Sequence, residues 1–104
     1  MSDTVETELS VVDVKIDNRL AWVTLNRPEK RNAMSPTLNR EMGAVLDELE
    51  LRDDVGVVVL TGAGESFSAG MDLKEYFRET ENQGPLQVAR VRKEATNWMW
   101  RRLL

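Results

Sequence analysis

The segment from Thr61 to Phe77, TGAGESFSAGMDLKEYF, holds the residues best suited to chemistry in this 104-residue chain. It follows an apolar run, Val55 to Leu60, and leads into a helical pattern that opens at Asp72. A strand, a turn rich in glycine and alanine and an acidic helix start leave backbone N–H groups without intrahelical acceptors, at the positive end of the helix dipole. Such a turn suits an anionic oxygen, either of a bound phosphate or of an oxyanion formed during a reaction.

The turn Ala69–Asp72 also has a plainer interpretation. Its glycine can supply an unusual backbone conformation, and Asp72 can cap the following helix without any role in chemistry. No Gly-Lys-Ser/Thr follows Gly62 and Gly64, and the chain has no GxGxxG pattern, so these two routes to nucleotide binding are not supported. On these residues alone, a structural turn and an oxyanion site both stay open.

Composition excludes several other classes of function. The net charge of −4 argues against an electrostatic affinity for nucleic acid or for an anionic membrane. The chain has no cysteine and no histidine, which excludes disulfides, thiolate metal sites and a Ser-His-Asp triad built from this chain alone. The first ten residues are polar and unlike a signal peptide, and no apolar run approaches membrane-spanning length, so we expect a cytoplasmic protein.

The elements that must position this turn can be predicted from hydrophobic periodicity. Residues 1–10 read as a polar tail, and residues 11–104 as part of one α/β domain. Val12, Val14 and Ile16 alternate with polar residues, which predicts a strand with one wet face. Asn18-Arg19 is expected to form a hairpin turn into a second strand, Leu20 to Leu25.

Helical spacing follows the polar loop from Asn26 to Ala33. Ser35-Pro36 is a favourable helix start, and the helix is expected to run to about Leu51. The near-continuous apolar run from Val55 to Leu60 is typical of a strand buried on both faces. The apolar stripe of the helix consists of Leu38, Met42, Val45, Leu46 and Leu49.

A last helix is predicted from about Pro85, after the break at Asn82–Gly84. Its pattern continues to Leu104 without a capping signal, so we expect this chain to be a fragment of a longer protein. Trp98 and Trp100 are interpreted as packing residues rather than ligand platforms.

Three segments resemble the enoyl-CoA hydratase/isomerase (crotonase) superfamily, in matching order. They are LNRPEKRNAMSPTL at Leu25–Leu38, VVVLTGAGESFSAG at Val57–Gly70 and MDLKE at Met71–Glu75. The extended form AGMDLKEYFRE, with Trp98-Met-Trp100 downstream, is most similar to the hydroxycinnamoyl-CoA (feruloyl-CoA) hydratase-lyases. The resemblance covers the chain from about Val11 onward. It implies an α/β fold, a ClpP/crotonase-like spiral of β-β-α units with only its N-terminal part present, and assembly as a homotrimer or homohexamer.

The resemblance also implies roles for single residues. In this family the residue after Ala-Gly, here Met71, supplies one backbone N–H of the oxyanion hole that polarises a thioester carbonyl. Lys30 matches a position that contacts CoA, where a cation suits the phosphates, although by itself it reads as a solvated loop charge. The stretch expected to line the acyl-thioester and part of CoA consists of Ala69, Gly70, Met71, Asp72 and Leu73.

Tyr76 points to the more specific activity. In the hydratase-lyases the matching tyrosine hydrogen-bonds the phenolic oxygen of the substrate, whereas the pattern alone would allow a half-buried helix tyrosine. The implied reaction hydrates a 4-hydroxycinnamoyl-CoA such as feruloyl-CoA and then cleaves it by a retro-aldol step to a hydroxybenzaldehyde (vanillin) and acetyl-CoA. The implied partner is the acyl-CoA itself, with no metal and no separate cofactor.

Two parts of the family machinery have no match here. The second oxyanion donor comes from a glycine-rich turn downstream and the acid/base glutamate lies later still, so we expect the chain alone not to turn over feruloyl-CoA. Two other interpretations stay open: a fatty enoyl-CoA hydratase or isomerase, and a non-catalytic truncated fragment that binds acyl-CoA at most.

Overall fold

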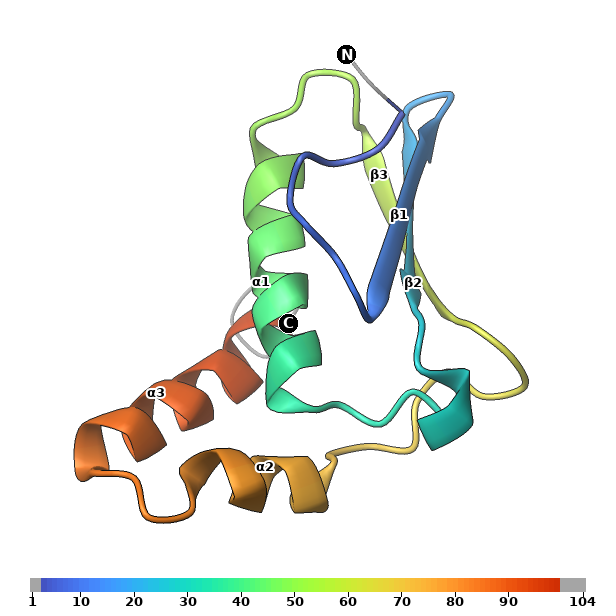
Figure 1. The fold of residues 1–104 in the computed structure, drawn as a ribbon. Helices are drawn as coiled ribbons and strands as arrows, with labels where there is room; N and C mark the ends of the chain where they lie inside the picture. Colours follow the sequence, from blue (N-terminus) through green and yellow to red (C-terminus); the bar gives the residue numbers. More distant parts are fainter. Residues whose placement is uncertain (1–2, 100–104) are drawn as a thin grey trace.

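The computed structural model of the chain describes residues 3–99, and a three-stranded sheet lies beside one long helix (Figure 1). The strands are β1 (Val12–Asp17), β2 (Leu20–Leu25) and β3 (Val57–Gly62), in the order β1-β2-β3. β1 and β2 are antiparallel, whereas β2 and β3 are parallel, because the helix between them carries the chain back across the sheet. The helices are α1 (Pro36–Glu50), α2 (Leu73–Thr80) and α3 (Pro85–Thr96), with a 3-10 turn, η1 (Pro28–Lys30).

The α/β layering expected from the sequence is confirmed. Figure 1 shows α1 along one face of the sheet, with α2 near the end at which α1 begins and α3 running back to contact α1. The turn between β3 and α2 therefore lies close to the loop between β2 and α1, although the two segments are far apart in sequence. This meeting of two loops is the setting of the candidate site.

The predicted hairpin and the facing of its strands are confirmed. Val12, Val14 and Ile16 of β1 are buried, and they pair with the buried side of β2. Asn18 and Arg19 both have positive φ, 50° and 67°, as a two-residue type I′ turn requires. Asparagine tolerates this conformation well, which is how a turn without glycine closes the hairpin.

Helix α1 begins where the sequence predicts. The Ser35 side chain caps it by accepting a hydrogen bond of 3.1 Å from the backbone N–H of Leu38. The whole predicted apolar stripe is buried against the sheet. Trp98 packs on the same core, only 1% exposed, and its indole N–H donates to Asn39 Oδ1 at 2.9 Å, which confirms its packing role. Trp100 and the rest of the predicted helical pattern to Leu104 lie outside the described residues.

The predicted N-terminal tail has no helix or strand over residues 3–10, yet it lies against α1. Glu48 accepts hydrogen bonds from the backbone N–H groups of Glu6 and Thr7. Glu41, two turns earlier on α1, accepts from the N–H groups of Ser10 and Val11. Two carboxylates on one face of the helix therefore anchor the segment that leads into β1.

The prediction that the third strand is buried on both faces is wrong. Val57 is 54% exposed and Val58 is 38% exposed. Within residues 3–99, β3 is an edge strand that pairs with β2 alone. An apolar run leads to burial only where other elements cover the strand. Here Leu60 packs against the core, Val58 on the same face is only partly covered, and the outer face with Val57 lies open beside Trp22.

This exposure can be tested by substituting matched valines. Val57→Thr should change the free energy of unfolding by less than about 0.5 kcal/mol, since the hydroxyl stays in water. Val23→Thr, at a position with 0% exposure on β2, should lower the free energy of unfolding by about 1–3 kcal/mol, because the hydroxyl is buried among apolar side chains. Urea denaturation of the chain measures both. Equal losses at the two positions would contradict the edge-strand description.

Candidate active site

A buried asparagine joins the two loops that form the site. Asn32 is 0% exposed, and its side-chain oxygen accepts a hydrogen bond of 2.7 Å from the backbone N–H of Arg27. Its side-chain nitrogen donates to the carbonyl oxygens of Ala63 and Ser66, both at 2.8 Å. One amide group thus uses both ends to bond the loop after β2 to the turn after β3.

A short parallel bridge continues this connection into the Ala-Gly-Met-Asp turn. Met34 pairs with Met71: the N–H of Met34 donates to the carbonyl of Gly70 at 2.7 Å, and the N–H of Asp72 donates to the carbonyl of Met34 at 3.0 Å. The N–H of Ala69 donates to the carbonyl of Arg31 at 2.9 Å. The turn is therefore bonded along its length to the polar loop.

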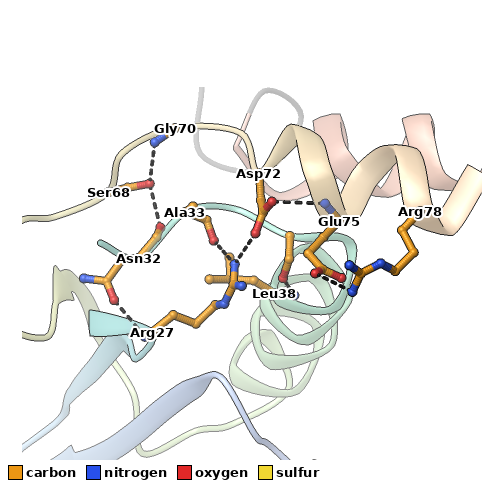
Figure 2. Close-up of polar contacts among 10 residues, drawn as sticks. Arg27, Asn32, Ala33, Leu38, Ser68, Gly70, Asp72, Glu75 and Arg78 are labelled. Carbon is orange, nitrogen blue, oxygen red and sulfur yellow. Dashed lines mark hydrogen bonds and ion pairs between the residues drawn. The ribbon is translucent and has the colours of Figure 1, made fainter. Parts of the chain in front are cut away.

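Ser68 fixes the residue before Met71. Its hydroxyl donates to the backbone carbonyl of Asn32 at 2.8 Å and accepts from the N–H of Gly70 at 3.1 Å, as Figure 2 shows. Gly70 has a φ of +98°, a backbone conformation that residues with a side chain rarely adopt. A Cβ there would meet no atom within 4 Å, so glycine is required by the backbone conformation and not by lack of space.

The backbone N–H of Met71 is the exception along this turn. The N–H groups of Gly70 and Asp72 are both bonded internally, but that of Met71 has no acceptor among the residues that the structure describes. In a parallel bridge successive N–H groups point to opposite sides, so the Met71 donor faces away from Met34. The residue itself is 54% exposed. A fixed, unbonded donor next to a helix N-terminus is able to stabilise a developing oxyanion.

Asp72 holds the helix side of the turn. Its Oδ1 accepts from the N–H of Glu75 at 3.1 Å as the cap of α2, and its Oδ2 pairs with Arg27 Nη1 at 3.1 Å. Burial raises the pKa of this carboxyl, but the Glu75 N–H and the Arg27 guanidinium outweigh burial, so the pKa of Asp72 lies below its ordinary value. The carboxylate is turned inward in this structure, toward its cap and its cation.

The other predicted site residues lie around this turn. Leu73 is 56% exposed at the start of α2, and Lys30 is exposed at the end of η1. Tyr76 is half-buried one turn into α2, with its ring edge-to-face against Phe77 at 5.9 Å between centroids. Within residues 3–99 its hydroxyl has no hydrogen-bond partner. The substrate and CoA contacts predicted for these residues, and for Ala69 to Asp72, stay predictions.

Sequence reasoning missed three residues that build this site: Arg27, Asn32 and Ser68. Their side chains bond groups that lie up to 45 positions away along the chain, so local periodicity carries no signal for them. The residue type gave a weak signal at Asn32. Asparagine is enriched at positive φ, and φ is 56° there.

Other classes of site find no support in the part of the chain that the structure describes. No three carboxylates in residues 3–99 gather closely enough to hold a metal ion. Over the same residues, no helix combines the length and the apolar character needed to cross a bilayer. The predicted absence of a cofactor, the cytoplasmic location and the trimeric or hexameric assembly stay predictions.

The lowered pKa of Asp72 predicts a pH-dependent contribution to stability. Because the folded pKa is below the unfolded value of about 3.9, the contribution is fully present above pH about 4 and is lost as pH falls through the folded pKa. Asp72→Asn keeps the helix cap but removes the charge, and should lower the free energy of unfolding by about 1–2 kcal/mol at pH 7. Urea titrations should show this difference shrinking below pH 4. A difference that stays constant down to pH 2 would contradict the assignment.

Comparison with known proteins identifies the family of this chain. The sequence pattern of the enoyl-CoA hydratase/isomerase family matches residues 15–103. A hydroxycinnamoyl-CoA hydratase-lyase of Pseudomonas fluorescens is 55% identical over 100 residues, 96% of this chain and 36% of that protein. A short-chain-enoyl-CoA hydratase of Clostridium acetobutylicum is 44% identical over 69 residues, 65% of this chain and 26% of that protein.

Solved structures show the same fold. A crystal structure of an enoyl-CoA hydratase/isomerase from Mycobacterium paratuberculosis has a TM-score of 0.68 at 27% identity, over 86% of this chain and 33% of that one. An enoyl-CoA hydratase from Mycobacterium tuberculosis has a TM-score of 0.61 at 45% identity, over 64% of this chain and 30% of that one. This chain thus spans about a quarter to about a third of the length of the curated relatives that it matches. The chain belongs to the enoyl-CoA hydratase/isomerase family, and its fold is the crotonase fold.

Proposed function

We propose that these residues form part of the active site of a hydroxycinnamoyl-CoA hydratase-lyase, which converts feruloyl-CoA and water into vanillin and acetyl-CoA. The observation that carries the proposal is the unbonded N–H of Met71, held between two bonded neighbours. The 55% identity to the Pseudomonas fluorescens enzyme supports the choice of substrate class.

The chemistry begins at the thioester carbonyl. The Met71 N–H and a second donor, which this chain does not supply, donate hydrogen bonds to the carbonyl oxygen and stabilise the negative charge that develops there as water adds to the β-carbon. The second hydrogen of the water is delivered as a proton to the α-carbon, which completes the β-hydroxyacyl thioester. Loss of the β-hydroxyl proton then breaks the bond between the α- and β-carbons, which releases the aldehyde and leaves the enolate of acetyl-CoA. The same donors stabilise that enolate until a proton restores acetyl-CoA. Donors of this kind are worth about 3 kcal/mol each.

Tyr76 would select the aromatic substrate. Its half-buried position one turn after the Met71 donor, and a hydroxyl with no partner in residues 3–99, support a role in binding the para-hydroxyl of the ring. Electron release from that oxygen assists the carbon–carbon cleavage. Lys30 would contact the phosphates of CoA, and the stretch Ala69–Leu73 would line the thioester, with the carboxylate of Asp72 turned inward to Arg27 and the Glu75 N–H.

A fatty enoyl-CoA hydratase is the second candidate. It is favoured by the 44% identity to the short-chain-enoyl-CoA hydratase and by the solved hydratases with the same fold. Hydration needs the same oxyanion donor but no partner for a phenol, so Tyr76 separates the two activities. A chain that only binds acyl-CoA is the third possibility, which the same experiment decides.

The experiment is a chimera in which residues 1–104 of this chain replace the matched segment of the Pseudomonas fluorescens enzyme. We expect aldehyde release from feruloyl-CoA, with kcat/KM falling about tenfold to a hundredfold in Tyr76→Phe because a buried phenol oxygen loses its partner. Hydration of crotonyl-CoA should change less than threefold. Phe77→Leu, at an adjacent ring that is 61% exposed, is the control and should leave both reactions within threefold.

Three results would count against the proposal. Crotonyl-CoA turned over faster than feruloyl-CoA would favour the fatty acyl hydratase. Equal losses with both substrates in Tyr76→Phe would remove the tyrosine from substrate selection. A folded chimera that binds CoA esters without turnover would favour the binding role.

A further inference from the structure

A buried ion pair lies next to the Met34–Met71 bridge, at the residue that follows Met71. Arg27 and Asp72 approach to 3.1 Å, and their side chains are only 10% and 12% exposed. We propose that Arg27 and Asp72 are positioning residues that aim the Met71 amide, so that they control the rate of the chemical step and not the affinity for the CoA ester. The inference rests on the oxyanion role proposed for Met71.

The ion pair joins the two chain segments that the Met34–Met71 bridge brings together. Arg27 Nη1 donates to the carbonyl of Ala33, the residue before Met34, and pairs with the carboxylate of Asp72, the residue after Met71. Figure 2 shows the guanidinium between these two groups. A single cation therefore connects both sides of the bridge next to the donor.

The bridge needs this support because it is isolated. Two backbone hydrogen bonds hold Met34 and Met71 together, outside any strand of the sheet. Asp72 carries the restraint further, since its other oxygen caps α2 at Glu75. The direction of the Met71 N–H is thus coupled to the start of a helix and to the polar loop at once.

The arrangement also keeps the Asp72 carboxylate ionised at neutral pH, so the ion pair with Arg27 is retained. Both the Glu75 N–H and the Arg27 guanidinium favour the ionised carboxylate. A charge-assisted contact that is largely removed from water is stronger and more directional than a neutral one. An oxyanion donor misplaced by about 1 Å can lose about a hundredfold in rate, so a restraint of this kind has a catalytic consequence.

The first test measures how rigidly the Met71 N–H is held in the 104-residue chain itself. Asp72→Asn keeps an acceptor for the Glu75 N–H but abolishes the ion pair. We expect the ¹⁵N order parameter of Met71 to fall from about 0.85 to below about 0.6, while Glu75 keeps its value. The control is Asp54→Asn, which removes the Arg52–Asp54 ion pair of 2.7 Å far from the turn and should leave Met71 unchanged. An unchanged Met71 in Asp72→Asn overturns the proposal.

The second test measures the rate in the chimera. Asp72→Asn should lower kcat about tenfold to a hundredfold, with KM within threefold of the parent chimera. Arg27→Lys keeps the positive charge, so this single variant should keep at least a third of the parent kcat. Asp54→Asn should leave kcat and KM within twofold. A rise in KM with unchanged kcat, or equal losses in Asp72→Asn and Asp54→Asn, would overturn the positioning role. An inactive parent chimera would refute the proposed function, while the order parameters would still decide whether the pair orders Met71.

Discussion

The backbone amide of Met71 is the donor on which the rest of this site depends. Its neighbours at Gly70 and Asp72 are bonded within the protein, so the chain immediately around Met71 has no freedom to turn that N–H inward. In the free protein water can solvate an exposed amide at little cost. In the proposed reaction a thioester would replace that water, and the same donor would then act on the developing charge without reorganisation, which is the physical basis of oxyanion stabilisation.

The surroundings of this donor are polar and fully bonded. Asn32 is buried where an apolar residue could pack, and its amide bonds three backbone groups from two loops. Within residues 3–99, no buried side-chain nitrogen or oxygen lacks a partner. A satisfied polar network of this kind is rigid and specific, whereas one missing bond would leave an expensive unpaired group. The apolar core between α1 and the sheet stabilises the fold, and the hydrogen bonds between the loops fix the orientation of the Met71 amide.

Local chemistry made much of the fold predictable. Alternation at Val12, Val14 and Ile16 predicts the facing of the hairpin, and Ser35-Pro36 predicts the start of α1, because both depend on residues close in sequence. The turn at Gly70 was predictable for the same reason. Burial of β3 was not, since it depends on which elements lie beside Val57 and Val58.

The supporting residues of the site lay beyond sequence reasoning. Arg27 reads as one of several loop cations, and nothing local indicates that it meets Asp72 in space. Ser68 looks like an ordinary turn serine until its hydroxyl is seen between Asn32 and Gly70. Resemblance to the family pointed to Met71, while only the three-dimensional arrangement explains what holds its amide in place.

The most direct measurement replaces a single peptide bond by an ester. In the chimera, an ester at Met71 removes its N–H and should lower kcat about a hundredfold to a thousandfold. It should cost little stability, because that N–H has no acceptor in residues 3–99 and only the Gly70 carbonyl becomes a weaker acceptor for Met34. An ester at Asp72, which removes the hydrogen bond to Met34, should cost more stability. An unchanged kcat with the Met71 ester would contradict the central claim.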